Sequence, residues 1–220
     1  MSKPRNSIPS PVSDPQGQTL TQAPRAWQRM LSGRRLDLLD PQPAEIEIDD
    51  IAHGLARVAR WNGQTRGAHA FSVAQHVLVV EEIADALYSP WSAGWRLAAL
   101  LHDAPEYVIG DLISPFKTAI GLDYKAFELK LLAAIHRRFG LPPVLPPEVT
   151  AGIKEADRVA AYFEATTLAG FSTEEAVRFF GSPDALPDAL AARLRTLTPW
   201  STEVAQRTFL ERFHTLAREG

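Results

Sequence analysis

The 220-residue chain contains no cysteine. This absence excludes a disulfide framework and a zinc site built from thiolates. Any metal bound by the chain would therefore take histidine and carboxylate ligands. Such ligands suit Co²⁺, Mn²⁺, Zn²⁺, Mg²⁺ or Fe²⁺.

Long apolar runs and a strong charge of one sign are also missing. No apolar stretch reaches the roughly 20 residues that a membrane-spanning helix requires. No apolar segment follows Lys3 and Arg5, so a secretory signal is not expected. The formal net charge of −3 gives no general attraction to nucleic acid. We therefore expect a cytoplasmic protein that binds neither a membrane nor a nucleic-acid polymer.

The overall composition is that of an ordinary globular protein, with 45% hydrophobic and 22% charged residues. Residues 1–24 differ, because prolines recur there among polar residues, and we expect them to form a disordered tail. Residues 25–220 are expected to form a single domain, since a chain of this length can bury a core without cross-links.

Apolar residues recur at helical spacing through most of the chain, and no convincing strand pattern follows residue 50. Partial alternation between Gly33 and Leu39 predicts at most a short strand or hairpin near the N-terminus. The expected helices cover approximately residues 49–61, 72–88, 92–107, 123–139, 148–169, 173–180, 184–197 and 202–218. The predicted fold class is therefore all-α, a helical bundle.

Ionisable residues gather near the end of the third expected helix. His102, Asp103 and Glu106 follow an apolar run at spacings of three or four, so they can share one rim of a helix. Asp111 adds a further carboxylate, and Pro105 indicates that the helix bends or ends here. Burying so many ionisable groups is costly unless they bind a metal or pair with one another.

Two more ionisable residues interrupt apolar helical stripes. His76 lies in the stripe of the second expected helix, and Asp157 lies in that of the fifth. An antiparallel bundle can bring both residues to His102 and Asp103 in its core. Two imidazoles and two carboxylates leave positions open for water and substrate, which is typical of a catalytic metal site rather than a structural one.

The order His76, then His102-Asp103, then Asp157 resembles the metal-binding signature of the HD-domain phosphohydrolase superfamily. The further matching segments are Arg60-Trp61, Ser72-Val73-Ala74-Gln75-His76, His102-Asp103-Ala104-Pro105-Glu106, Gly110-Asp111-Leu112, Pro115 and Lys117. With these segments the chain is similar to the bacterial 5′-deoxynucleotidase branch. It is also similar to related bacterial and phage enzymes that act on deoxynucleoside triphosphates. The resemblance covers about residues 30–170.

The resemblance implies a metal-dependent phosphohydrolase with an HD-type helical bundle and a deoxyribonucleotide substrate. The implied metal ligands are His76, His102, Asp103 and Asp157. The implied catalytic residues, which orient water and carry a proton to the leaving oxygen, are Glu106 and Asp111. The implied substrate-binding residues are Arg60 for phosphate, Trp61 for the sugar or base and, with weaker support, Lys117, Arg66 and His69.

Two reactions are compatible with this resemblance. A 5′-deoxynucleotidase would convert a deoxynucleoside monophosphate to deoxynucleoside and phosphate, and this reaction is the preferred prediction. A triphosphohydrolase would release tripolyphosphate from a deoxynucleoside triphosphate. The segment 62–71 is longer than the corresponding deoxynucleotidase loop, which favours a different pocket. Two other interpretations stay open: a nucleotide-sensing module without turnover, and a structural bundle with a buried ionisable network.

Other residues carry expectations without catalytic chemistry. A homodimer could form through the apolar C-terminal helices that contain Phe179, Phe180, Phe209 and Phe213. His53 is expected to be structural. The side chains of His136 and His214 are expected to face solvent.

Overall fold

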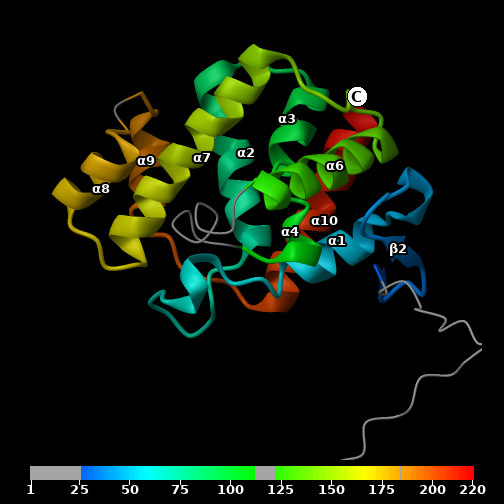
Figure 1. Cartoon of the computed structure of the whole chain (residues 1–220). Coiled ribbons are helices and arrows are strands. Elements are labelled where there is room, and N and C mark those ends of the chain that lie inside the picture. The colour runs from blue at the N-terminus through cyan, green and yellow to red at the C-terminus, as the bar shows by residue number, and fades with distance from the viewer. Residues whose placement is uncertain (1–25, 112–121, 184) are drawn as a thin grey trace, which may run out of the picture.

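The structure, a computed structural model, describes residues 26–111, 122–183 and 185–220. Within these ranges it is built almost entirely of helices, with one two-stranded hairpin near the N-terminal end (Figure 1). The predicted all-α class is confirmed. The predicted tail at residues 1–24 and the predicted substrate-binding residue Lys117 lie outside the described residues. In the described part of the chain, every helix is too short or too polar to cross a membrane.

The hairpin consists of β1 (Trp27–Arg29) and β2 (Arg35–Asp37), which pair in antiparallel fashion. Gly33 has a φ of 87° in the turn, a value that glycine adopts without steric cost. Ser32 ties the turn to the first helix, because its N–H and its hydroxyl both donate to the Asp50 carboxylate. The predicted short strand is therefore one arm of a hairpin that is anchored to the helical core.

The first helix, α1 (Ile48–Leu55), is shorter than the predicted segment, which extended to residue 61. That prediction was wrong because the next backbone segment pairs with another extended segment instead of continuing the helix. Ala59 forms an antiparallel bridge with Ser72. The Arg60 N–H donates to the Phe71 carbonyl at 2.8 Å.

A short 3₁₀ turn, η2 (Arg60–Gly63), follows this bridge. Trp61 and Asn62 have φ values of 56° and 51°, in the left-handed region that residues other than glycine rarely adopt. The left-handed backbone reverses the chain direction within the turn. It keeps Arg60 and Trp61 close to the start of the next helix.

Helix α2 (Val73–Tyr88) is the central element of the fold. It packs against α7 (Pro147–Thr167), α3 (Ala93–Leu100) and α10 (Thr202–Glu219), as Figure 1 shows. Ser72 caps α2, since its hydroxyl accepts a hydrogen bond from the N–H three residues later at 3.2 Å. Because α2 packs against three other helices, most of its first two turns are buried.

The third predicted helix, 92–107, is divided in two. Helix α3 ends at Leu100, and a separate short helix, α4 (Glu106–Ile109), follows a turn. Pro105 has no N–H to donate to the carbonyl four residues earlier, so the helix cannot continue through it. His102 and Asp103 consequently lie in the turn between two helices, and not on one helical rim with Glu106 as expected.

The remaining helices follow the prediction more closely. They are α6 (Leu122–Arg138), α8 (Thr173–Phe180), α9 (Asp188–Leu194) and the already mentioned α7 and α10. Helix α9 is shorter than the predicted segment 184–197. It starts only after Pro187, because a proline keeps the residue before it out of the helical region.

Three expectations about exposure were wrong. Phe209 and Phe213 are buried in the core and cannot form a dimer surface. His136 is 2% exposed, since the chain folds back at the end of α6 and the Pro142 carbonyl accepts a hydrogen bond from its Nδ1 at 3.1 Å. Phe179 is 61% exposed, and His214 faces solvent as expected.

Candidate metal centre

Three segments that are distant in sequence meet beside the first turn of α2. His76 comes from α2, His102 and Asp103 come from the turn between α3 and α4, and Asp157 comes from α7. The close packing of α2 against α7, visible in Figure 1, brings the first and last of these residues together. The four residues that were predicted as metal ligands thus lie in one region of the protein.

His76 is fully buried, and both nitrogens of its ring face acidic side chains. Nδ1 lies 2.5 Å from Oε1 of Glu164. An ionised carboxylate can only accept, so Nδ1 carries a proton and donates a hydrogen bond to Glu164. In the neutral form of the ring, which a metal ligand requires, Nε2 keeps its lone pair; this atom lies 3.2 Å from Oδ1 of Asp157 and 3.5 Å from Oδ2 of Asp103.

His102 is oriented in the same way by a backbone group. Its Nδ1 donates to the carbonyl of Ala99 at 2.8 Å, so in the neutral ring the lone pair again belongs to Nε2. This Nε2 lies 3.3 Å from Oδ2 of Asp103. Metal-binding histidines commonly donate their second nitrogen to a carboxylate or a backbone carbonyl, and both partners are found here.

The donor atoms fit a metal ion. One ligand atom each from His76, His102 and Asp103, here called the metal cluster, all lie within 4.8 Å of one another. Ligand atoms about 2.1 Å from an ion and at adjacent positions are about 3.0–3.4 Å apart, close to the observed separations. Within the described residues, Nε2 of both histidines is buried without a hydrogen-bond partner. The metal cluster could therefore hold a metal ion.

Asp157 lies in the same region, but its oxygens are not among the ligand atoms that define the metal cluster. Its Oδ1 meets Nε2 of His76, and the residue is half-buried on α7. Burial alone would raise the pKa of this carboxyl, but the contact with His76 lowers it when that imidazole is protonated. Asp157 therefore supplies a charged oxygen next to the metal cluster.

Electrostatics shift the titration of the whole cluster. Burial and the Arg60 guanidinium both favour neutral His76. Three carboxylates outweigh these effects and raise the pKa of the imidazole well above its usual value; they are Glu164, Asp103 and Asp157. Burial would also raise the pKa of Asp103, but the two histidines hold it well below its usual value. The carboxylates therefore remain charged near neutral pH and attract a cation.

The turn that carries Arg60 and Trp61, here called the Arg60–Trp61 turn, reaches into this region. Nη1 of Arg60 lies 3.4 Å from Oδ2 of Asp111 and 4.0 Å from Oδ2 of Asp103. Its Nε and Nη2 both lie 3.4 Å from Oε2 of Glu164. The indole N–H of Trp61 donates to the same oxygen at 2.8 Å. The turn therefore joins two predicted substrate-binding residues to the cluster.

Glu164 was missed in the sequence. It is fully buried on α7, and contacts with His76 and Arg60 overcome the effect of burial and lower its pKa to about 2. The available signal was its position seven residues, or two helical turns, after Asp157, which places both carboxylates on one face of α7. Glu164 also interrupts an apolar stripe of this helix, as Asp157 does.

The other predicted site residues have different surroundings. Glu106 is 1% exposed at the start of α4, and its N–H donates to the Asp103 carbonyl at 3.0 Å. Arg66 and His69 are exposed in the loop before α2. Within the described ranges, neither of these two makes a hydrogen bond or an ion pair with the metal cluster.

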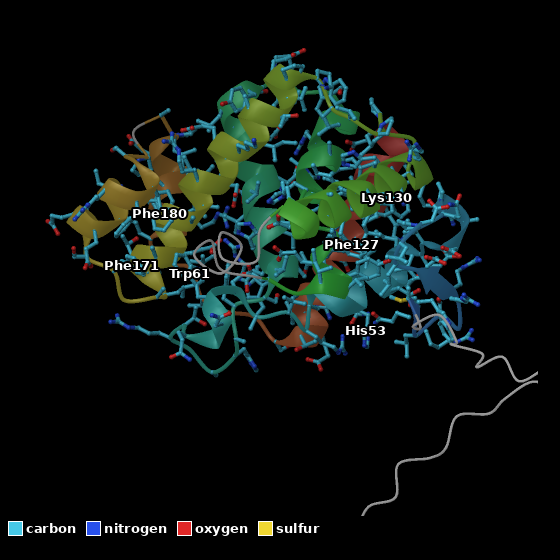
Figure 2. All side chains as sticks on the ribbon, viewed as in Figure 1. His53, Trp61, Phe127, Lys130, Phe171 and Phe180 are labelled. Carbon is cyan, nitrogen blue, oxygen red and sulfur yellow. The ribbon has the colours of Figure 1, made fainter. Side chains whose placement is uncertain are left out.

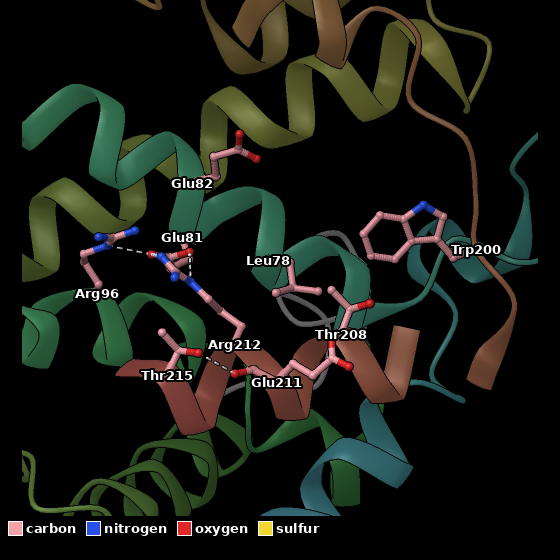
Figure 3. A pocket seen from close by; sticks show the side chains of 9 residues that line it. All are labelled: Leu78, Glu81, Glu82, Arg96, Trp200, Thr208, Glu211, Arg212 and Thr215. Carbon is pink, nitrogen blue, oxygen red and sulfur yellow. Dashed lines mark hydrogen bonds and ion pairs between the residues drawn. The ribbon is translucent and has the colours of Figure 1, made fainter. Parts of the chain in front are cut away.

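A hollow of about 440 Å³ lies elsewhere, between α2, α3 and α10 (Figure 3). Its central group is Glu81, which is buried and pairs with the guanidinium groups of Arg96 and Arg212. Arg96 also contacts Asp85 at 3.1 Å. The arginine charges are thus already neutralised, and this ion-pair network links three helices without histidine ligands.

Comparisons with known proteins identify relatives but no activity. No protein-family model matches the chain. It is 58% identical to the uncharacterized protein RCAP_rcc00048 of Rhodobacter capsulatus over 195 residues, which are 88% of this chain and 97% of that protein. It is 30% identical to the uncharacterized protein YfdR of Escherichia coli K12 over 173 residues, which are 79% of this chain and 85% of that protein. The chain therefore belongs to the family that contains YfdR and RCAP_rcc00048.

Proposed function

We propose that the protein is a metal-dependent phosphohydrolase of the HD-domain superfamily that hydrolyses deoxynucleoside monophosphates to deoxynucleosides and phosphate. The observation that carries the proposal is the metal cluster itself. Two buried imidazole nitrogens and one carboxylate oxygen lie within 4.8 Å of one another, and the Arg60 guanidinium lies next to them. A cation site beside an arginine is the arrangement that phosphate esters require.

A divalent ion held by His76, His102 and Asp103, with Asp157 as a candidate fourth ligand, would supply Lewis-acid assistance to the phosphoryl group. The chain's own residues do the remaining work. Phosphoryl transfer depends on positioning and on neutralisation of developing charge. The protein therefore needs a fixed cation for phosphate, a group that handles protons and a surface for the nucleoside.

Arg60 is the candidate phosphate ligand. A guanidinium group has five N–H donors, and the contacts with Glu164 and Asp111 use three of them. Two donors remain for phosphate oxygens. The two carboxylates hold the planar guanidinium in place, so the entropic cost of binding phosphate is low.

Glu106 and Asp111 are the candidate proton carriers. Glu106 is buried directly after the turn that bears His102 and Asp103. The Asp111 carboxylate touches Arg60 and so lies on the same side as the candidate phosphate ligand. When water attacks the phosphorus, one of these groups would accept a proton from that water and deliver a proton to the departing 5′-oxygen of the sugar. The Trp61 indole would pack against the sugar or base.

A product assay tests this proposal. Metal-free protein is reconstituted with Co²⁺ or Mn²⁺ and incubated with deoxynucleoside mono- and triphosphates, with ribonucleoside monophosphates as the sugar control. Ion-exchange chromatography resolves the products. Orthophosphate and deoxynucleoside from monophosphates support the proposal. Tripolyphosphate from triphosphates would replace it with a triphosphohydrolase, and binding without turnover would indicate a nucleotide-sensing module.

A further inference from the structure

We infer that Glu164 is a positioning residue that couples the metal cluster to the Arg60–Trp61 turn. The inferred effect on substrate binding rests on the proposed function, whereas the inferred effect on metal binding rests on the geometry alone. Oε1 of Glu164 accepts from Nδ1 of His76 at 2.5 Å. Oε2 accepts from the Trp61 indole at 2.8 Å and contacts the Arg60 guanidinium at 3.4 Å.

The partners of Glu164 distinguish it from an ordinary buried ion pair. A buried carboxylate is costly unless it is paired and hydrogen-bonded. The other buried glutamate of this kind, Glu81, pairs with Arg96 and Arg212, which lie away from the metal cluster. In the described part of the chain, the side chains that contact the Glu164 carboxylate were all predicted from sequence to bind metal or substrate: His76, Arg60 and Trp61. The carboxylate therefore joins two functional groups.

On the metal side, Glu164 selects the tautomer of His76. Because Oε1 accepts a hydrogen bond from Nδ1–H, the neutral ring carries its lone pair on Nε2, on the side where Asp103 and Asp157 lie. The hydrogen bond also fixes the ring orientation and increases the basicity of Nε2 as a ligand. Loss of such a partner typically lowers metal affinity about 10–100-fold.

On the substrate side, Glu164 supports a strained turn. The left-handed backbone of Trp61, with a φ of 56°, persists only if its surroundings hold it. The indole is held by Oε2 of Glu164 and by edge contacts with Phe171 and Phe180, with ring centroids 5.6 and 5.9 Å away (Figure 2). Glu164 thereby places the Arg60 guanidinium beside the metal cluster.

Only a carboxylate can serve both sides. In Glu164→Gln, one side-chain atom still accepts but the other becomes an NH₂ donor. If the amide oxygen faces His76, the NH₂ faces the N–H groups of Trp61 and Arg60; if it is reversed, the NH₂ faces Nδ1–H of His76. Glu164→Gln therefore loses either the hydrogen bond with His76 or the contacts with Trp61 and Arg60, and Glu164→Ala loses both.

The experiment compares the full-length protein with Glu164→Gln, Glu164→Ala and the matched control Glu81→Gln, which alters a buried, arginine-paired glutamate away from the cluster. Co²⁺ affinity is measured by chelator competition and by the visible Co²⁺ spectrum. Binding and turnover of a deoxynucleoside monophosphate are measured on the same samples. Circular dichroism establishes that each variant is folded.

We expect Glu164→Ala to bind Co²⁺ 10–100-fold more weakly with an altered spectrum, and to raise the KM for nucleotide at least tenfold, whereas Glu81→Gln retains wild-type Co²⁺ affinity. A folded Glu164→Ala protein with Co²⁺ affinity within twofold of wild type would overturn the inference. Equal losses in Glu81→Gln would also overturn it. If no nucleotide is hydrolysed by any sample but Co²⁺ affinity falls as expected, the proposed function is wrong, and the inferred role of Glu164 in metal binding is retained.

If Glu164→Ala does not fold, Trp61→Phe provides the second test. This change removes the five-membered ring with the N–H that reaches Oε2, and keeps a six-membered aromatic ring. We expect a higher KM, or weaker nucleotide binding, with Co²⁺ affinity close to wild type. Unchanged nucleotide binding in Trp61→Phe would contradict the coupling.

Discussion

His76 and Glu164 are 88 positions apart in the chain, yet Nδ1 of the first lies 2.5 Å from Oε1 of the second. This hydrogen bond spans the interface between α2 and α7. Both side chains are fully buried, so the bond is shielded from competing water. The relative position of the two helices therefore decides the orientation of the imidazole in the metal cluster.

Asp103→Asn should strongly reduce metal retention. Oδ2 of Asp103 lies between Nε2 of His76 and Nε2 of His102, and the substitution removes its charge while keeping its size. Since the proposed site would lose a direct ligand, we expect affinity to fall by more than the roughly 10–100-fold typical of outer partners. Metal analysis after dialysis checks this, with the exposed Asp188→Asn as the control. Full metal content in Asp103→Asn would exclude this residue as a ligand.

Arg60→Lys should impair phosphate binding although the charge is preserved. An ammonium group cannot contact Glu164 and Asp111 with a planar fork and still present two donors to phosphate. We expect the KM for a deoxynucleoside monophosphate to rise about 10–100-fold, in keeping with the loss of one or two charge-assisted hydrogen bonds. Arg57→Lys, at an exposed arginine that contacts Gln206 instead, is the control. Identical kinetics of the two variants would remove Arg60 from the substrate site.

Ser72→Ala should lower the free energy of unfolding by about 1 kcal/mol, because it removes the N-cap of α2. Ser201→Ala removes the equivalent cap of α10 and should cost a similar amount. Urea denaturation measures both. Only Ser72→Ala should also weaken metal binding, since Ser72 begins the helical turn that carries His76. A larger loss of metal affinity in Ser201→Ala would be inconsistent with this view.

Gly54→Ala should destabilise the protein by about 1–3 kcal/mol through overpacking. A Cβ at position 54 would lie 2.7 Å from Cβ of Tyr107 and 3.0 Å from its backbone, so α1 would be forced away from α4. Gly94→Ala is the matched helical control, since its nearest neighbour would be 3.7 Å away at Ser92. Thermal or urea unfolding should show a loss for the first variant and no loss for the second. Equal stability of the two would show that the α1–α4 contact can relax.

His136 should make stability depend on pH in the mildly acidic range. Burial lowers the pKa of this imidazole below its usual value of 6.5, so the unfolded chain binds the proton more readily than the folded protein does. The neutral form therefore favours folding above about pH 6.5, and this contribution decreases as the pH falls through the lower folded pKa. Comparing unfolding free energies of the wild type and His136→Gln between pH 5 and 8 isolates the effect.

In that comparison, His136→Gln should show a shallower decline on acidification than the wild type. His214→Gln provides the control, because this histidine is exposed on α10. A wild-type slope in His136→Gln would show that the buried imidazole takes up a proton without disturbing the fold.

The local signals in the sequence were sufficient for several of the helices. The Ser72 cap and apolar periodicity predicted α2, and amphipathicity predicted α8 and α10, almost to the residue, because these signals involve neighbours within one or two turns. Pro105 likewise indicated the break before α4. The residues of the metal cluster could be named in advance because an ionisable group inside an apolar stripe is conspicuous in the sequence.

Long-range contacts decided the rest. Helix α1 stops early because the backbone near Ala59 pairs with Ser72, and His136 is buried because the chain folds back over it. The role of Glu164 depends on three partners that are 88 to 104 positions away. Local patterns in the sequence were enough to recognise a helical protein and to name most of the ionisable residues of the site. Which of those charges meet depends on how the helices pack, because a buried carboxylate takes its partners from the helices around it.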